Sequence, residues 1–382
     1  MSADERLAGL VREAVGAVVD PELRRPLADL DMVRTVTADG GDVRVEISLT
    51  IVGCPASDRI QREVRAAAHG VSGTDRVEVE LGVMTPEQRA ALTERLRGGR
   101  ARGIPFTADS LTRVIAVTSG KGGVGKSTLT ANLAVALARR GRTVGLVDAD
   151  VHGFSIPGLL GLVDAQGRTT KPTRIDDLIV PPVAHGVKIV SIGMFLREGD
   201  EGRAVAWRGP MLHRTVQQFL TDVWFGDLDV LLIDMPPGTG DVAISIGQLL
   251  PHADVLVVTT PQHAAADVAV RSGTVARQTG QRVIGVIENM APLTLPDGTV
   301  LDLFGAGGGE DVARALSADG DTVPLLATVP LSAALRTGGD AGLPVVLGTP
   351  DDPAARAIDA LAATLTASGP SLAGRALPLG VR

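Results

Sequence analysis

The stretch Gly120-Lys121-Gly122-Gly123-Val124-Gly125-Lys126-Ser127 decides the fold of this 382-residue chain. It satisfies the pattern G-x-x-x-x-G-K-S, with a β-branched run before it and a helical pattern after it. Glycines occupy four of its eight positions, so backbone N–H groups can turn inward where side chains would obstruct. Strand, loop and helix agree, and the stretch therefore predicts a phosphate-binding loop rather than a glycine-rich turn that binds nothing.

Three side chains of this loop have predicted roles in binding Mg-ATP. Lys126 is expected to contact the β- and γ-phosphates, the hydroxyl of Ser127 to ligate Mg²⁺, and Thr128 to reach the α-phosphate. The N-terminal partial charge of the following helix adds attraction for the phosphates. The predicted nucleotide contacts in the loop are Gly120, Lys121, Gly122, Gly123, Val124, Gly125, Lys126, Ser127 and Thr128.

Acidic residues follow two of the apolar runs. Asp234 ends the run from Val230, before Met-Pro-Pro-Gly-Thr-Gly-Asp, and is expected to hold Mg²⁺ through a water; the alternative is a helix N-cap. Asp148 and Asp150 end the run from Val144. We expect Asp148 near the metal and Asp150 placed to orient the attacking water, although one of the pair could be only a capping or turn residue.

The pattern after Arg113 indicates an α/β fold. Short β-branched runs alternate with amphipathic segments such as Ser127 to Arg140 and Asp267 to Gln278, as buried parallel strands joined by crossover helices do. We therefore predict a P-loop NTPase domain with a mostly parallel sheet flanked by helices, preceded by a small α+β domain. The predicted division is a small domain at 1–97, a Gly/Arg-rich linker at 98–110, the ATPase domain at 111–368 and a short tail at 369–382.

Composition excludes several functions. The net charge of −7 and an aromatic content of 2% give no electrostatic or stacking basis for nucleic-acid binding. No stretch approaches the roughly 20 apolar residues of a membrane span. The single cysteine, Cys54, fits a reducing compartment. These features predict a cytoplasmic protein that binds neither nucleic acid nor membrane.

Six motifs stand out along the second part of the chain. They are K-G-G-V-G-K-S-T from Lys121, V-D-A-D-V-H-G-F-S-I-P from Val147, W-R-G-P-M from Trp207, D-M-P-P-G-T-G-D from Asp234, I-E-N-M from Ile287 and F-G-A-G-G-G from Phe304. Together they resemble the Mrp/ApbC family, MinD-like P-loop ATPases implicated in iron–sulfur cluster assembly and transfer. The resemblance covers about Val114 to Pro330, and residues 5 to 96 look like the MIP18 (DUF59) domain.

The resemblance implies a homodimeric ATPase whose nucleotide state controls loading or delivery of a cluster to apoproteins or assembly proteins. Lys121, otherwise a solvated loop lysine, would reach the partner's nucleotide, so the catalytic residues are Lys121, Lys126 and Asp150. Asn289, after the run from Val283, would read the adenine edge; the alternative is a turn asparagine with satisfied hydrogen bonds.

The sequence departs from the family at the cluster site. In the family a C-x-x-C pair lies between I-E-N-M and F-G-x-G-G-G, but here residues 291–303 contain no cysteine. A bridging [4Fe–4S] cluster needs four ligands, usually thiolates. Cys54, in a Gly-Cys-Pro loop, is the one thiol for a labile cluster or a client contact; otherwise it is an inert small side chain.

Three functions therefore remain open. The first is an ATP-dependent iron–sulfur carrier, and the second is a metal-free nucleotide-switched scaffold for client proteins. The third is a MinD- or ParA-like positioning ATPase, whose expected mark is a basic amphipathic C-terminal helix. The tail from Ser371 does not read as such a helix.

Overall fold

The computed structural model describes residues 2–98, 103–150, 153–196, 209–295, 297–317 and 322–367. These residues form two compact units. The N-terminal unit comprises Met1–Gly103, Pro172–Val183 and Asp222–Gly226, and the phosphate-loop unit contains the rest. Val151, His152, Trp207, Arg208, residues 99–102 of the expected linker and the expected tail lie outside the described residues.

The N-terminal unit contains a three-stranded sheet and three helices. Strand β2 lies in the middle, antiparallel to β1 and parallel to β3. Alternation along β2 buries Val43, Val45 and Ile47, while Asp42 and Arg44 face solvent. Its elements are α1 (Ala3–Gly16), β1 (Val33–Asp39), β2 (Asp42–Leu49), α2 (Ser57–His69), β3 (Arg76–Val83) and α3 (Pro86–Arg97).

Two segments from later in the chain complete the core of the N-terminal unit. The antiparallel strands β6 (Thr173–Ile175) and β7 (Leu178–Val180) bury apolar side chains there, and so does Trp224. The indole Nε1 of Trp224 donates a hydrogen bond to the Leu96 carbonyl over 3.2 Å, and its ring lies 5.9 Å from the guanidinium of Arg25. We call residues 172–183 and 222–226 the inserted segments.

The phosphate-loop unit is built on an eight-stranded sheet in the order β15-β12-β11-β4-β10-β5-β9-β8. Neighbours from β15 to β9 are parallel, so their carboxyl ends share one edge. The strands of this sheet are β4 (Arg113–Ser119), β5 (Val144–Asp148), β8 (Val183–Ala184), β9 (Val187–Ser191), β10 (Val230–Asp234), β11 (Asp254–Thr259), β12 (Arg282–Ala291) and β15 (Leu325–Pro330).

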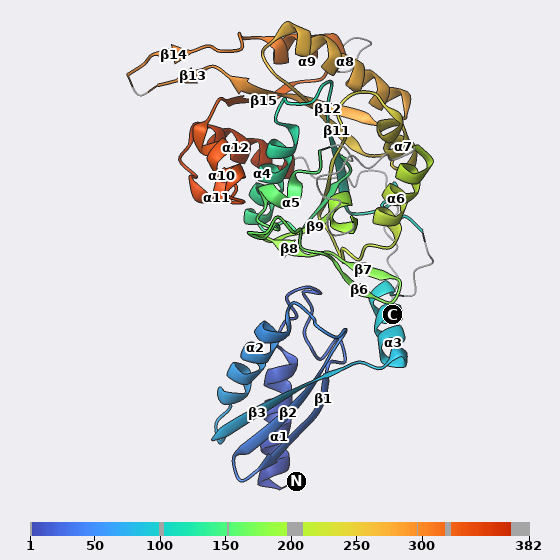
Figure 1. Cartoon of the computed structure of the whole chain (residues 1–382), viewed down its shortest axis with the longest axis vertical. Helices are drawn as coiled ribbons and strands as arrows, with labels where there is room; N and C mark the ends of the chain where they lie inside the picture. Colours follow the sequence, from blue (N-terminus) through green and yellow to red (C-terminus); the bar gives the residue numbers. More distant parts are fainter. Residues whose placement is uncertain are drawn as a thin grey trace. The chain divides into compact units, whose positions relative to one another are not determined.

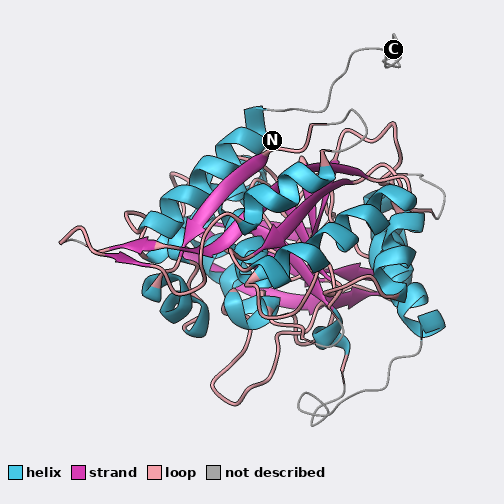
Figure 2. Ribbon diagram, turned by 90° about the horizontal axis from the view of Figure 1, so that it is seen from above, coloured by secondary structure: helices cyan, strands magenta, loops and turns pink. Residues whose placement is uncertain are grey.

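Helices cover both faces of this sheet (Figures 1 and 2). On one face α4 (Lys126–Arg139) contacts β10 and β5, and α12 (Pro353–Ala367) packs beside it. Helix α8 (His263–Gln278), which contacts β11 and β4, begins at His263 rather than at the predicted Asp267 because three alanines extend its first turn. The other helices are α5 (Ile156–Leu159), η1 (Ile192–Phe195), α6 (Gly209–Thr221), α7 (Asp241–Leu249), α9 (Gly308–Leu316), α10 (Ala333–Asp340) and α11 (Val345–Gly348).

The predicted α/β fold class is confirmed: the large sheet is mostly parallel and flanked by helices, and a small α+β unit precedes it. Among the described helices, none combines the length and the apolar composition that crossing a bilayer requires.

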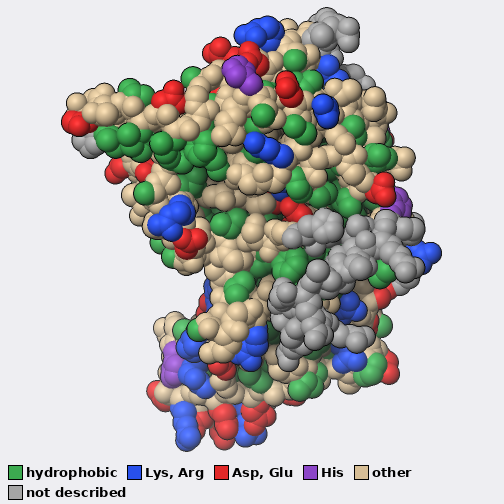
Figure 3. Space-filling model, turned by 45° about the horizontal axis from the view of Figure 1, so that its top comes forward, with side chains coloured by type: hydrophobic (Ala, Val, Ile, Leu, Met, Phe, Trp, Pro, Cys, Tyr) green, Lys and Arg blue, Asp and Glu red, His purple; other side chains and the backbone are tan. Residues whose placement is uncertain are grey.

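The interval without cysteines forms a hairpin. Strands β13 (Leu293–Thr294) and β14 (Val300–Leu301) pair antiparallel immediately after β12 and project from the sheet (Figure 1). Val300 and Leu303 are 59% and 65% exposed, and Figure 3 shows hydrophobic side chains along this projection.

Candidate nucleotide-binding site

Strand register brings the predicted acidic residues together. β10 lies between β4 and β5, and Asp234 is paired in register with Val117 on one side and Asp148 on the other. Both aspartates end their strands, and both side chains are fully buried. The phosphate loop follows β4 at the same edge of the sheet, so the loop and the two carboxylates meet at the carboxyl ends of three adjacent strands.

Close packing explains two glycines of the loop. A Cβ on Gly120 would lie 2.2 Å from the backbone of Val268 in α8. Gly125 has φ +79°, and a Cβ there would lie 2.3 Å from the side-chain nitrogen of Asn289. The loop can therefore follow this path only with glycine at both positions, and its backbone is held against α8 and β12.

Lys126 and Asp234, which are buried, form a polar cluster with the half-buried Ser127 at the beginning of α4. The Nζ of Lys126 lies 2.8 Å from Asp234 Oδ1, and the hydroxyl of Ser127 donates to Asp234 Oδ2 over 2.6 Å. Lys126 Nζ is also 4.0 Å from Asp150 Oδ2. The structure thus brings together four sequence-predicted residues, counting Asp150, within one network of charges.

Burial governs the ionisation of the two aspartates. Burial and the nearby negative charge of Asp234 raise the pKa of Asp148 well above its usual range. Burial also raises the pKa of Asp234, although the Lys126 ammonium opposes the shift. Two adjacent carboxylates with one nearby lysine hold excess negative charge, and an added cation would relieve it.

Two hydroxyl groups that sequence reasoning missed orient these carboxylates. The Oγ1 of Thr130, in the first turns of α4, lies 3.0 Å from Asp234 Oδ1 and 2.8 Å from the Lys126 carbonyl oxygen. Ser191, at the end of β9, donates its hydroxyl to Asp148 Oδ2 over 2.9 Å. The available signal was positional: Thr130 is four residues after Lys126, and Ser191 ends a strand beside β5.

A cavity of ≈ 380 Å³ lies against the phosphate loop. Residues 121–128 line it, together with Ser119, Asp150, Gly153, Ser155 and Pro237. A triphosphate fits this cradle because backbone amides and Lys126 border it. The hydroxyl of Ser127 and the carboxylate of Asp234 supply oxygen donors of the kind Mg²⁺ prefers.

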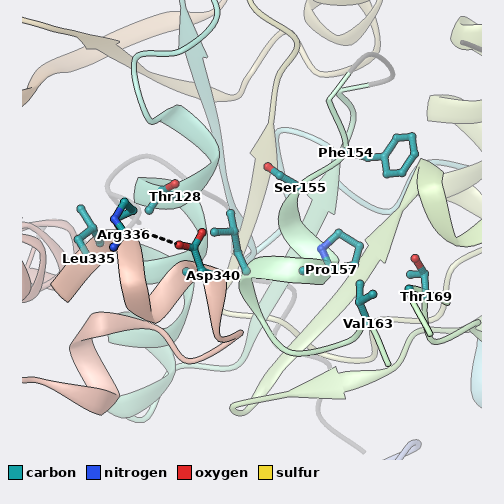
Figure 4. Close-up of a pocket in the computed structure, with 13 residues that line it drawn as sticks. Thr128, Phe154, Ser155, Pro157, Val163, Thr169, Leu335, Arg336 and Asp340 are labelled. Carbon is teal, nitrogen blue, oxygen red and sulfur yellow. Dashed lines mark hydrogen bonds and ion pairs between the residues drawn. The ribbon is translucent and has the colours of Figure 1, made fainter. Parts of the chain in front are cut away.

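A second cavity of ≈ 500 Å³ shares Thr128 and Ser155 with the first. Its other walls come from α5, α10 and the segment between Val163 and Thr169, and they are largely apolar (Figure 4). Arg336 and Asp340 form an ion pair of 2.7 Å on α10. Since Thr128 is the predicted α-phosphate contact, this cavity adjoins the position at which the nucleoside of a bound nucleotide would begin.

Asn289 and Lys121 make other contacts in this structure. The side-chain nitrogen of Asn289 donates to the carbonyl oxygen of Val124 over 2.8 Å, and the residue is 3% exposed. Lys121 Nζ donates to Gln262 Oε1 over 3.2 Å at the surface. The adenine-reading role of Asn289 and the cross-dimer role of Lys121 stay predictions.

Cys54 belongs to the N-terminal unit. It is 4% exposed, and its thiol donates to Glu22 Oε2 over 3.6 Å, while the hydroxyl of Thr173 donates to Glu22 Oε1 over 2.8 Å. Burial, together with the nearby carboxylates, raises the pKa of the Cys54 thiol to about 11. At neutral pH this cysteine is therefore a protonated thiol.

Each of the two units matches a known protein family. Residues 110–366 match the ParA-type family described as NUBPL iron-transfer P-loop NTPase, and residues 10–81 match the family described as iron–sulfur cluster assembly protein. The iron–sulfur cluster carrier protein of Mycobacterium tuberculosis is 53% identical over 98% of this chain and 97% of its own length. That of Synechocystis is 41% identical over 90% of this chain and 93% of its own.

Solved structures agree on the fold. The nucleotide-binding protein of Archaeoglobus fulgidus, solved with ADP, is 35% identical and covers 62% of this chain and 92% of its own, with a TM-score of 0.51. The septum site-determining protein MinD of Pyrococcus horikoshii, solved with Mg-ADP, is 26% identical and covers 69% of this chain and 98% of its own, with a TM-score of 0.50.

Proposed function

The chain belongs to the family of NUBPL iron-transfer P-loop NTPases, and we propose that it binds and hydrolyses Mg-ATP as a homodimer serving iron–sulfur cluster assembly or transfer. The observation that carries the proposal is the polar cluster of Lys126, Ser127 and Asp234 beside the loop cavity. The two structural relatives with ADP or Mg-ADP support nucleotide binding, and the carrier relatives support the cellular role.

Nucleotide binding would rearrange the partners of Asp234. The Lys126 ammonium, now 2.8 Å from Asp234, would turn to the β- and γ-phosphates. Ser127 and Asp234 would hold Mg²⁺. The ion would neutralise charge on the phosphate oxygens. Without nucleotide, Lys126, Ser127 and Asp234 therefore bond to one another through the same groups that would bind the nucleotide and the metal.

Hydrolysis needs a water in line with the γ-phosphate. Asp150 lines the loop cavity and lies 4.0 Å from Lys126 Nζ, a position from which its carboxylate would orient that water. Lys121 of the partner subunit would add positive charge to the transferring phosphoryl group, as Lys126 does from its own subunit. Lys121 is exposed enough to exchange Gln262 for a phosphate oxygen.

ATP hydrolysis by matched lysine variants tests this assignment. Lys126→Ala should lose ATP hydrolysis while keeping its fold by circular dichroism. Lys171→Ala, which removes an exposed lysine that lines neither cavity, should keep wild-type turnover. Turnover retained by Lys126→Ala would contradict the assignment.

The cargo in this proposal is an iron–sulfur cluster delivered to apoprotein clients. The relatives in Mycobacterium tuberculosis and Synechocystis are named carriers, and the N-terminal unit matches an iron–sulfur assembly family. With one cysteine per chain, a dimer offers two thiols, so a bound cluster needs further ligands that are not cysteines of this protein.

A second candidate is a nucleotide-switched scaffold that holds no metal. Its specific support is Cys54, because a buried thiol with a pKa near 11 is a poor metal ligand at neutral pH. Anaerobic reconstitution with iron and sulfide separates the two. A carrier gives protein-bound iron and visible absorption, which Cys54→Ala removes if the thiol is a ligand. A scaffold gives neither signal in either protein.

A further inference from the structure

Thr130 has one hydroxyl proton and two acceptors for it. Its Oγ1 is 2.8 Å from the carbonyl oxygen of Lys126 and 3.0 Å from Oδ1 of Asp234. A hydroxyl can donate to only one of them at a time. Both Thr130 and Asp234 are fully buried, so no solvent water replaces whichever bond is absent.

The choice between the two acceptors depends on Lys126. In this structure Asp234 Oδ1 already has the Lys126 ammonium at 2.8 Å, and Oδ2 has the Ser127 hydroxyl at 2.6 Å. Thr130 can then give its proton to the Lys126 carbonyl, the i−4 bond that threonines in helices often make.

We propose that Thr130 is a positioning residue that holds the Asp234 carboxylate for Mg²⁺ once the nucleotide has drawn Lys126 and Ser127 away. This rests on the proposed nucleotide function. When Lys126 turns to the phosphates, Oδ1 of Asp234 loses its cation. Within the part of the chain that the structure describes, the side-chain donor that remains next to this oxygen is the hydroxyl of Thr130. Its proton then favours the carboxylate, because a bond to a charged acceptor is stronger than one to a carbonyl.

The consequence is geometric. With Oδ1 held by Thr130, the other oxygen, Oδ2, keeps facing the Ser127 side, where the metal is expected. Without that bond, Asp234 would be free to rotate about its side-chain torsion, and a buried carboxylate would lack a donor on one oxygen.

Titration of a fluorescent ADP analogue with the full-length protein, with and without Mg²⁺, tests the proposal. Thr130→Val removes the hydroxyl at nearly constant shape, and Thr130→Ser restores it. Thr366→Val is the matched control, because Thr366 is a half-buried helical threonine on α12 whose bonds go to the Ala362 and Ala363 carbonyls.

In Thr130→Val the Mg²⁺ concentration giving half-maximal nucleotide affinity should rise roughly tenfold or more, as loss of a bond to a charged group implies. Affinity without Mg²⁺ should fall by a clearly smaller factor, because the bond from Thr130 then satisfies Asp234 Oδ1 but positions no metal ligand. Thr130→Ser and Thr366→Val should titrate as wild type does.

Three results would overturn the proposal. The first is an unchanged Mg²⁺ requirement in Thr130→Val. The second is an equal loss of affinity with and without Mg²⁺, which a general packing defect would produce. The third is a Thr130→Ser variant as impaired as Thr130→Val. If the wild type itself binds no nucleotide, the proposed function fails and this inference fails with it, a result distinct from the other three.

Discussion

The side chain of Asn289 donates a hydrogen bond to the carbonyl oxygen of Val124 over 2.8 Å and so connects strand β12 to the phosphate loop. The next residue, Met290, has φ +59°, a left-handed conformation uncommon for a residue other than glycine. The pairing of β12 with β15 shifts register between Asn289 and Ala291. This local irregularity lets the strand turn Asn289 toward the loop before the β13–β14 hairpin begins.

Asn289→Ala should weaken nucleotide binding by releasing the loop. The substitution leaves the buried Val124 carbonyl without this donor, which should lower the free energy of unfolding by about 1–3 kcal/mol. Calorimetry and thermal unfolding measure the two effects. Asn132→Ala, which removes a buried amide bonded to the Thr128 carbonyl, should lose stability and keep more of the affinity. Wild-type affinity in Asn289→Ala would mean that the loop does not need this bond.

Gly125→Ala should abolish nucleotide binding through a steric clash rather than through backbone strain alone. Gly125 and Gly141 both have φ +79°, but only at Gly125 does an added Cβ meet another group, the Asn289 side chain at 2.3 Å. Gly141→Ala should cost about 1–2 kcal/mol of stability for the left-handed backbone and leave affinity unchanged. Equal behaviour of the two variants in a nucleotide titration would refute the clash.

Asp148→Asn should stabilise the nucleotide-free protein at neutral pH. The pKa of Asp148 is raised in the folded state, so the charged carboxylate opposes folding above the unfolded value of about 3.9. The gain in free energy of unfolding that Asp148→Asn gives over wild type should be absent below that pH. It should grow as pH rises toward the raised pKa of the folded state, and then level off.

Asp164→Asn is the control with the opposite sign. Backbone and side-chain bonds from Arg168 lower the pKa of Asp164, so its charge supports folding above about pH 3.9 and this support is lost as pH falls through the lowered value. Thermal unfolding across pH compares the variants. An Asp148→Asn protein less stable than wild type at pH 7 would contradict the assignment of a strained buried charge.

Trp224→Ala should destabilise the N-terminal unit selectively. Trp224 is 8% exposed within the core of that unit and bonds to the Leu96 carbonyl. Removing a buried indole costs about 3–5 kcal/mol. Hydrogen exchange should quicken in β2 and β3 but not in β4 and β5, with a smaller change in Trp224→Phe. Uniform quickening across both units, or none, would show that the inserted segments do not stabilise the N-terminal unit in this way.

Local patterns made much of the site predictable. The loop from Gly120 has a fixed spacing, and Asp148, Asp150 and Asp234 follow apolar runs that must be buried strands, so their convergence followed from parallel topology. Thr130 and Ser191 could not be found in this way, because a hydroxyl in a helix or at a strand end is common and only the folded chain brings it to a carboxylate.

The inserted segments escaped prediction for a different reason. Strands β6 and β7 have three residues each, too short to show a period, and the core that they complete is formed by residues far away in sequence. Likewise, α10 lines the larger of the two cavities because the C-terminal helices pack on α4 and α5. A local sequence pattern does not predict that packing.

Calorimetric titration of the full-length protein with ATP in the presence of Mg²⁺ tests the central claim most directly. We predict saturable, Mg²⁺-dependent binding of one nucleotide per chain, lost in Lys126→Ala and kept in Lys171→Ala. Absence of measurable binding by the folded wild-type protein would contradict the account of the loop, the cluster around Asp234 and the function built on them.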